Sequence, residues 1–316
     1  MFFYKIEAIT LAILAFSLSL SAEDTGHSGQ DFAPSASPDG KQIVYYAYRG
    51  QSGDLPDLYI VDRKTGIERR VTDTPGMFEI EPQWTPDGSR VAFMGGPSMK
   101  ELAMYTINPD GSDYRLYYDG DGFGPPNWSP DGTQMVFWLK HESGGSDLLI
   151  QNFESGAQTL LEIEMGGDNS SPTWSSDGKQ IAFSHRDINN EGKTDDITRD
   201  ADGIYLINLQ SHAVSKLSDK PAIAYSLEWA PDGGHIYYMG PAVDGVMHIH
   251  RIPGHGGPAI QVTADTNGPA YFPAFADNGR TLVFSARLNE NATRIMTMPI
   301  GQVGINGRPT TLDFAN

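Results

Sequence analysis

The 316-residue chain contains no cysteine. A disulfide framework, a zinc–thiolate site and a thiol nucleophile are therefore excluded. Positive charge is also scarce: 22 Lys and Arg residues stand against 40 Asp and Glu residues, for a net charge of −18 at pH 7. Because nucleic acids and anionic membrane surfaces repel an acidic protein, neither is an expected partner. The charge instead favours cations or basic partners.

Two catalytic motifs and a second apolar run are missing as well. The sequence has no Gly-x-Ser-x-Gly nucleophile elbow and no His-Glu-x-x-His zinc motif. After residue 22, no stretch approaches the ~20 consecutive apolar residues that a membrane-spanning helix needs. These absences exclude the commonest serine-hydrolase and zinc-peptidase signatures and predict no membrane span in the body of the chain.

The N-terminus carries one apolar run, over residues 8–22, which ends in small residues. Ser19 and Ser21 suit the −3 and −1 positions of a cleavage site, and Lys5 is the only positive charge before the run. We interpret residues 1–21 as a secretory signal peptide, with a membrane anchor as the alternative. Residues 22–30 are then a flexible leader of an exported protein, either periplasmic or secreted.

One seven-residue motif recurs six times. Its clearest copy is Pro82-Gln83-Trp84-Thr85-Pro86-Asp87-Gly88, and an alternating apolar segment follows each copy. Proline presets the first turn position, aspartate accepts bonds from nearby backbone amides, and glycine supplies a permissive φ. The closing glycines lie 44 to 55 residues apart, at Gly40, Gly88, Gly132, Gly178, Gly233 and Gly279. A repeat of this length is typical of propellers and arrays.

Each repeat predicts four short strands, which in the first repeat cover residues 32–37, 43–48, 57–62 and 68–72. The pattern predicts an all-β fold over residues 31–316, a six-bladed β-propeller with four antiparallel strands per blade. Its blades should start near residues 31, 80, 124, 170, 225 and 271. A seven-bladed ring is the structural alternative. The strand near Phe32 is expected to lie beside the last strand, residues 310–314, at the ring closure.

The motif, followed by Asp57-Leu58-Tyr59-Ile60-Val61-Asp62 and then Arg-x-Val/Leu-Thr, resembles the PD-type repeats of the TolB propeller family. The TolB N-terminal domain has no counterpart in the sequence, and similar repeats occur in secreted sugar lyases and beside serine peptidases. The resemblance implies an exported, non-enzymatic scaffold that binds a protein segment or small ligand at the channel mouth. Its partner would be an envelope or extracellular protein. The alternative is a carbohydrate-active enzyme, either a polysaccharide lyase or a glycoside hydrolase.

Loops at one channel end usually carry the ligand site of such a fold. A pair of carboxylates there could serve glycoside hydrolysis, although solvated acidic loops are the alternative. Two histidines after the second strands of repeats three and four occupy places that we interpret as equivalent, and lyases of similar repeats hold a metal with histidines. We assign no catalytic residue. The candidates are Glu79, Glu81, Asp121, His141, Asp168, His185, Tyr225 and Tyr271.

The fourth repeat contains an acidic insertion that resembles calcium loops of the Asp-x-Asp-x-Asp-Gly-x-x-Asp kind. Alternating oxygen ligands and a glycine suit a hard cation such as Ca²⁺, and the ligands would be Asp187, Asn189, Glu191 and Asp195. A solvated acidic loop is the alternative. His248 and His250 share one face of a predicted strand, where they could be either metal ligands or packing residues between blades.

Overall fold

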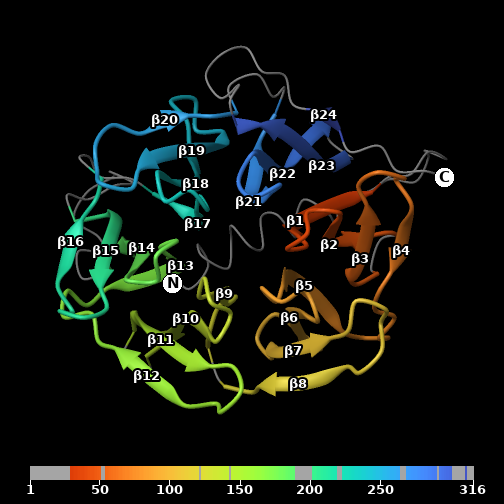
Figure 1. Cartoon of the computed structure of the whole chain (residues 1–316), viewed down its shortest axis with the longest axis horizontal. Helices are drawn as coiled ribbons and strands as arrows, with labels where there is room; N and C mark the ends of the chain where they lie inside the picture. The colour runs from red at the N-terminus through yellow and green to blue at the C-terminus, as the bar shows by residue number, and fades with distance from the viewer. Residues whose placement is uncertain are drawn as a thin grey trace.

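The structure is a computed structural model that describes residues 29–50, 54–120, 122–141, 144–188, 201–218, 223–263, 268–289, 292–300 and 310–311. Among these residues the regular structure is β-strand, and Figure 1 shows the sheets arranged radially around a central axis as a β-propeller. No helix in the described ranges is long and apolar enough to cross a membrane. The predicted signal peptide, residues 1–21, lies outside them.

Four sheets have four strands each, and within each sheet the consecutive strands pair antiparallel. These sheets contain β5 (Phe78–Trp84), β6 (Val91–Gly96), β7 (Ala103–Ile107) and β8 (Arg115–Tyr118); β9 (Asn127–Trp128), β10 (Gln134–Lys140), β11 (Ser146–Asn152) and β12 (Gln158–Leu161); β13 (Asp168–Trp174), β14 (Gln180–Arg186), β15 (Gly203–Asn208) and β16 (Val214–Lys216); and β17 (Tyr225–Trp229), β18 (His235–Pro241), β19 (Met247–Pro253) and β20 (Ile260–Gln261).

The fifth sheet has eight strands and joins the two ends of the chain. It contains β1 (Gln30–Ala36), β2 (Gln42–Tyr48), β3 (Asp57–Asp62), β4 (Glu68–Arg70), β21 (Ala270–Ala276), β22 (Thr281–Asn289), β23 (Ala292–Pro299) and β24 (Thr310–Thr311). The strands of the first repeat agree with the predicted bounds to within two residues. Strand β1 begins at Gln30, so the last residue of the predicted leader already belongs to the sheet.

The join between the two halves of this sheet differs from the expectation. The start of β1 pairs in parallel with β23, through Gln30 and Thr293, rather than with the last strand. The described part of β24 pairs with Met296 and Thr297 of the same strand. Strand β23 therefore pairs with β1 at Thr293 and with the described part of β24 at Met296 and Thr297.

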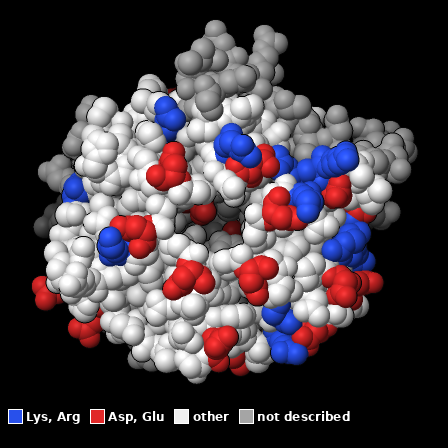
Figure 2. All heavy atoms as spheres, in the orientation of Figure 1, with Lys and Arg blue, Asp and Glu red and all other residues white. Residues whose placement is uncertain are grey.

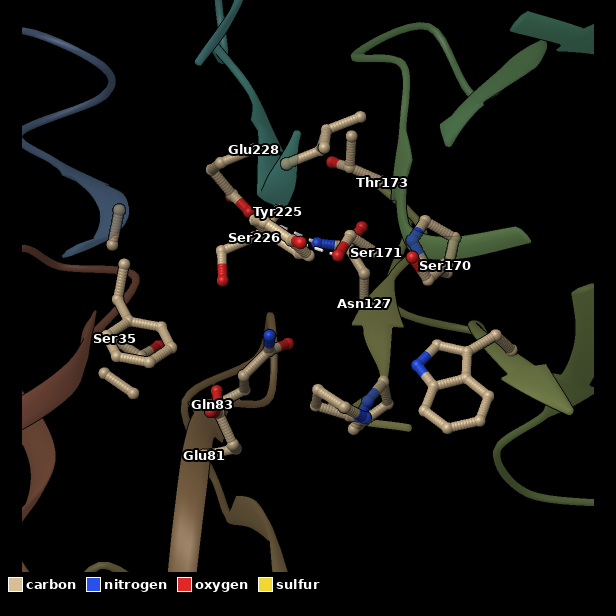
Figure 3. A pocket seen from close by; sticks show the side chains of 18 of the residues that line it. Ser35, Glu81, Gln83, Asn127, Ser170, Ser171, Thr173, Tyr225, Ser226 and Glu228 are labelled. Carbon is tan, nitrogen blue, oxygen red and sulfur yellow. Dashed lines mark hydrogen bonds between the residues drawn. The ribbon is translucent and has the colours of Figure 1, made fainter. Parts of the chain in front are cut away.

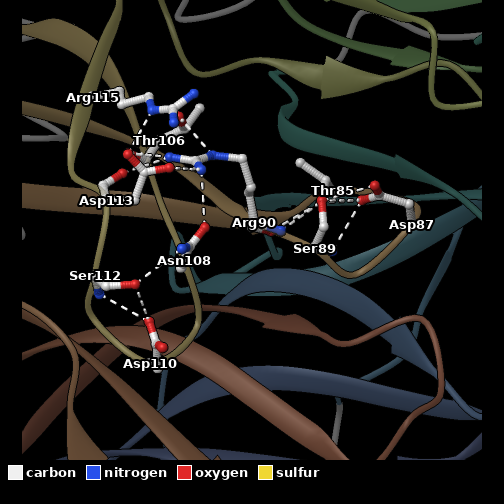
Figure 4. A network of polar contacts seen from close by, with 10 residues as sticks. All are labelled: Thr85, Asp87, Ser89, Arg90, Thr106, Asn108, Asp110, Ser112, Asp113 and Arg115. Carbon is white, nitrogen blue, oxygen red and sulfur yellow. Dashed lines mark hydrogen bonds and ion pairs between the residues drawn. The ribbon is translucent and has the colours of Figure 1, made fainter.

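In five of the six motif copies, the turn aspartate accepts a hydrogen bond from the backbone N–H two residues later. In the second copy the Asp87 carboxylate accepts hydrogen bonds from the Thr85 hydroxyl at 2.6 Å and from the Ser89 backbone N–H at 3.0 Å (Figure 4). The Arg90 guanidinium then joins this turn to the β7–β8 hairpin by an ion pair with Asp113 at 2.7 Å and a bond to Asn108 at 2.9 Å. The predicted role of the motif aspartate as an amide acceptor is confirmed.

The six turns also contact one another in a circle. All six closing glycines have positive φ, between 69° and 81°, which glycine adopts without steric cost. A Cβ on each of five glycines would meet the preceding turn at 2.7 to 3.9 Å, in the pairs Gly88–Pro38, Gly132–Pro86, Gly178–Pro130, Gly233–Ser176 and Gly279–Pro231. A Cβ on the sixth, Gly40, would meet Asp277 Oδ1 at 3.0 Å, and this approach closes the circle.

Aromatic rings on the second and third strands stack within the sheets. The ring centroids are 6.2 Å apart for Tyr45 and Tyr59 and 5.4 Å apart for Tyr238 and His250. His250 thus replaces a tyrosine as a packing residue, and its Nε2 lies 3.2 Å from the Gly240 carbonyl. His248 is buried, with Nδ1 3.2 Å from the Thr263 hydroxyl. Both histidines are held by packing and protein hydrogen bonds.

Candidate functional site

A cavity of about 1160 Å³ runs through the centre of the ring. It is lined by the first strand of every repeat, namely β1, β5, β9, β13, β17 and β21. Figure 2 shows it as an opening at the centre of one face, with acidic side chains visible inside, and Figure 3 shows its polar lining from close by. Because all six repeats contribute to it, we call this cavity the channel.

Five of these strands carry a β-bulge at the same place. In each, one residue takes a left-handed φ and lines the channel: Ala33 (49°), Glu81 (51°), Ser171 (50°), Ser226 (46°) and Phe272 (53°). A bulge bends the strand and redirects its side chains. The left-handed position therefore brings one side chain from each of these five strands to the channel wall.

Strand β9 is the exception to this pattern. The residue that corresponds to Glu81 is Pro125, whose ring fixes φ near −65° and forbids the left-handed conformation. The strand is accordingly two residues long, whereas β5 and β13 each have seven. A single sequence difference thus explains why the third repeat has the shortest stretch of regular strand at the channel.

A second ring of channel residues comes from the middle position of the Pro-x-Trp part of the motif. Three of them accept a hydrogen bond from the backbone N–H of the next motif tryptophan: Ser35 from Trp84 (3.1 Å), Asn127 from Trp174 (3.0 Å) and Thr173 from Trp229 (3.1 Å). Each bond ties one first strand to its neighbour and contributes about 1 kcal/mol. Within the described ranges, Gln83 and Glu228 occupy the same position without such a bond.

Glu81 and Glu228 are the two carboxylates at these ring positions, and both point into the channel (Figure 3). Glu228 Oε2 accepts a long hydrogen bond, 3.4 Å, from the Asn127 amide, while Glu81 has no side-chain hydrogen bond among the residues that the structure describes. Burial raises the pKa of Glu81 to about 7 and the pKa of Glu228 to about 8. No neighbouring charge contributes to either shift, so neither carboxyl has a counter-ion among the residues that the structure describes.

Three of the predicted candidates line the channel, namely Glu81, Asp168 and Tyr225. Both carboxylates were expected in loops before the first strands, but Glu81 lies inside β5 and Asp168 begins β13. The strands start earlier than the sequence pattern indicates, because the bulge interrupts their alternation. Asp121 lies outside the described residues.

The other candidates are not among the residues that line the channel. Glu79 is fully buried inside β5, and this burial raises the pKa of its carboxyl, while the side chains of Thr72, Thr74 and Tyr114 oppose the rise. Tyr271 is half-buried within β21, where its ring centroid lies 6.4 Å from that of Phe272. Glu79 therefore packs between repeats rather than at the channel mouth.

The predicted equivalence of His141 and His185 is wrong. His185 lies inside β14 and pairs in register with Asn169, whereas the matching pair in the third repeat is Phe123 with Leu139. His141 comes two residues after Leu139 and follows the end of β10. Strands β10 and β14 both have seven residues, but His141 lies nine residues after Gly132 and His185 lies seven residues after Gly178, so the two histidines differ by two positions in the repeat.

The two histidines also have different surroundings. His185 is buried, with Nδ1 2.8 Å from the Asn169 side-chain oxygen and its ring edge-on to Tyr205, and burial lowers its pKa. His141 is half-exposed and its Nε2 lies 3.0 Å from a carboxylate oxygen of Asp147. Each imidazole has its own partner, and neither lines the channel.

Most of the predicted calcium loop lies outside the described residues, because Asn189, Glu191 and Asp195 belong to the omitted segment. Asp187 is described, and its backbone N–H donates a hydrogen bond of 2.9 Å to the Asp202 carboxylate. In the described ranges, no three His, Asp or Glu side chains are grouped in a way that could hold a metal ion.

Sequence reasoning missed Glu228 and Gln83. Both residues occupy the middle position of Pro-x-Trp, which varies from copy to copy while its neighbours stay similar. A comparison of the six copies at this position would have identified them. Glu228 stands in that position beside Leu227, where the other copies have proline. A charged side chain at a position that is otherwise small or neutral is the feature that marks the site.

Comparisons with known proteins agree with this architecture. The family model described as the TolB beta propeller domain matches residues 19–138 and 96–306. The Tol-Pal system protein TolB of Francisella tularensis is 26% identical over 189 residues, which cover 58% of this chain and 42% of that protein. The chain spans about half the length of the curated relatives it matches.

Two solved structures are similar in fold. TolB from Acinetobacter baumannii superposes with a TM-score of 0.66 at 19% identity, covering 83% of this chain and 62% of that one. An oligogalacturonate lyase from Vibrio parahaemolyticus superposes with a TM-score of 0.56 at 13% identity, covering 87% and 92%. At these identities the likeness concerns the fold alone. The matches to the family model cover most of the sequence, and the chain belongs to the TolB beta propeller domain family.

Proposed function

We propose that this chain is an exported, non-enzymatic propeller whose channel binds a protein segment or a small ligand. In this proposal the eight-stranded sheet is two blades joined at Gln30 and Thr293, so the ring has six blades. A closed ring of blades holds its channel-lining strands in a fixed arrangement, which reduces the ordering cost of binding.

The observation that carries the proposal is the lining of the channel. Its volume of about 1160 Å³ lies slightly above the usual range for small-molecule pockets and suits an extended segment. The wall contains half-buried aromatic rings together with Gln83 and Glu228. Among the described residues, the side chains of Gln83 and Glu228 make no strong hydrogen bond to the neighbouring strands. Aromatic surface with a few convergent polar groups is typical of recognition sites.

The partner in this proposal is an envelope or extracellular protein. Two features support it: the predicted signal peptide at residues 1–21, and the likeness to a protein named for the Tol-Pal system. The acidic net charge of −18 favours a partner with basic groups over nucleic acid.

Within the described part of the chain, two arrangements that the enzymatic alternatives would need are not found. A lyase site with His141 and His185 would require the two imidazoles to converge, but each is bound to a different residue. A retaining glycosidase needs two carboxyl groups about 5 Å apart, which would raise the pKa of one through the other. Glu81 and Glu228 show no such mutual effect.

The test compares the partners that the parent chain captures from envelope extract with those captured by a variant whose channel is filled by a larger side chain. Gln83→Trp puts a large side chain into the channel without removing a side-chain bond, and Gln210→Trp makes the same change on an exposed outer turn. We expect the parent chain and Gln210→Trp to capture the same saturable partner and Gln83→Trp to lose it at least about tenfold. Equal capture by Gln83→Trp, or turnover of a polysaccharide by the parent chain, would contradict the proposal.

A further inference from the structure

The two channel carboxylates break the pattern of the repeats. At the middle position of Pro-x-Trp, where Glu228 stands, the other copies have uncharged residues: Ser35, Gln83, Asn127, Thr173 and Ala274. Glu81 occupies the bulge position of its strand, three residues before the motif tryptophan. The other five copies also have uncharged residues at this position: Ala33, Pro125, Ser171, Ser226 and Phe272. The ring therefore forms with neutral residues at both positions, and neither carboxylate is needed to build it.

Two other carboxylates of low exposure have cationic partners, whereas the buried Glu79, which lies outside the channel lining, has none among the described residues. Asp31 is buried and bound by the Arg49 guanidinium, with Arg294 also close. Asp277 is bound by Arg63 at 2.8 Å. Burying a carboxylate without such a partner is costly, which is why proteins normally provide one.

The channel carboxylates have no such partner. The charged and titratable side chains that line the channel with them are Lys100, Lys140, Asp168, Tyr46, Tyr48 and Tyr225. Burial alone raises the pKa of Glu81 and of Glu228, and no ion pair joins either of these carboxylates to a lysine or arginine among the described residues. Lys100 and Lys140 are exposed. The acidic groups thus form an uncompensated site inside a cavity that is open to solvent.

We propose that the channel binds cationic organic groups, ammonium or guanidinium, at Glu228 and at Glu81, where each carboxylate can bind one cation. This inference rests on the proposed function, since it names the ligand chemistry of the same channel. Among the described residues, Glu81 has no side-chain N–H donor and Glu228 has only the long bond from Asn127. The incoming cation supplies further N–H donors, and charge-assisted bonds of this kind are about twice as strong as neutral ones. The half-buried ring of Tyr225 on the wall offers an additional face for a cation.

Proton competition gives this site a characteristic pH dependence. The cation binds the ionised carboxylates, so protons compete with it below the raised pKa values of about 7 and about 8. Affinity should rise with pH through this window, and it should fall again only near pH ~10, where an amine loses its own charge. A neutral ligand that fills the channel would not show this rise.

The experiment uses calorimetric titration of the full mature chain with three probes. The first is a five-residue peptide with an acetylated N-terminus, an amidated C-terminus and a free ammonium on its central lysine. The second is the same peptide with norleucine in place of the lysine, and the third is free 1,5-diaminopentane. The variants are Glu228→Gln, Glu81→Gln and their combination. Glu154→Gln, on an exposed turn, is the control with the same loss of charge. Circular dichroism confirms folding, and the single variants keep the test valid if the double variant unfolds.

At a pH of about 8.5, we expect the parent chain and Glu154→Gln to bind the lysine peptide at least about tenfold more tightly than the norleucine peptide. Each single Gln variant should lose about threefold or more of that preference, and binding should weaken several-fold near pH ~6. Binding of the diamine without the peptide also supports the inference and assigns a free amine as the source of the cation.

Two results would overturn the inference. Equal binding of the lysine and norleucine peptides would show a channel that takes ligands without a preference for cations, which leaves the proposed function standing. Failure of both cationic probes to bind would remove the cation site, and the capture experiment with Gln83→Trp would then decide the proposed function separately.

Discussion

Arg63 and Asp277 form a bidentate ion pair between the first and the last repeat, although 214 positions separate them in the chain. Their two N···O distances are 2.8 Å and 3.0 Å, and the same Asp277 Oδ1 lies against Gly40. At the turn of the last repeat, aspartate replaces the proline of the motif and takes a left-handed φ of 55°. The substitution that breaks the motif therefore provides the link between the last repeat and the first.

Arg63→Ala should lower the free energy of unfolding by about 1–2 kcal/mol, because a partly buried, bidentate pair exceeds the usual value of an exposed one. Arg70→Ala is the matched control, since Arg70 is more exposed and pairs only with Asp57 and Asp73 of its own repeat. We expect the control to lose less than about 0.5 kcal/mol in urea unfolding. Equal losses for both variants would show that the pair does not contribute to ring closure.

Glu228→Gln should stabilise the protein at high pH only. The raised pKa means that the folded state binds this proton more tightly than the unfolded state, whose glutamate pKa is near 4.5. Stability of the parent chain therefore falls as pH rises from about 4.5 to about 8 through this group. We expect the variant to gain about 1–2 kcal/mol above pH ~8, after allowance for screening by channel water, and little below pH ~4.5.

Chemical unfolding between these two pH values measures the effect, and Glu154→Gln, whose side chain is exposed, should show no comparable change. A gain for Glu228→Gln that is the same at both ends of the range would mean that the carboxyl titrates normally in the channel.

Ser171→Pro should destabilise the protein by about 3 kcal/mol or more, because proline cannot adopt the left-handed φ of 50° that the bulge requires. Ser171→Ala is the control: it keeps the backbone free and loses only the hydrogen bond from the Ser226 N–H, about 1 kcal/mol. Thermal melting distinguishes the two. A proline variant that melts together with the alanine variant would show that the bulge is dispensable.

His185→Ala should cost about 2–3 kcal/mol of stability, because it removes a buried ring and leaves the Asn169 oxygen without its partner. The lowered pKa of His185 adds a pH effect: the unfolded state takes up the proton first, so stability falls as pH drops below about 6.5. In the alanine variant this part of the acid sensitivity should disappear.

His141→Ala is the comparison, because His141 is half-exposed and pairs with a single carboxylate. It should cost less than about 1 kcal/mol in the same melts. A larger loss for His141→Ala than for His185→Ala would contradict the assignment of His185 as the packing residue.

The fold was predictable because its signal is repeated. The motif turn gives the same local chemistry in each copy, as in the Thr85–Asp87 bond, and the alternating strands follow it at a fixed distance. Errors arose where the strand pattern is interrupted. Glu81 looked like a loop residue because the bulge shifts the alternation by one, and a bulge leaves no reliable mark in sequence unless a proline such as Pro125 forbids it.

The site was predicted less well than the fold. Glu81, Asp168 and Tyr225 were placed at the channel by their position before or within first strands, whereas Glu228 was overlooked as part of the repeated motif. Its importance depends on what surrounds it, namely a half-buried carboxyl with one long bond to Asn127. Sequence shows that a charge is present, but only the three-dimensional arrangement shows that none of the described residues provides a counter-ion for it.

The central claim is that the channel, through its two carboxylates, is the ligand site. The most direct measurement is ¹³C NMR of the glutamate side-chain carboxyls in the mature chain, with Glu81 and Glu228 assigned from their Gln variants, during titration with the lysine peptide near pH ~7.5. The account predicts saturable shifts of these two resonances toward the ionised form, with Glu154 unchanged. Saturable binding that leaves both resonances in place would contradict it.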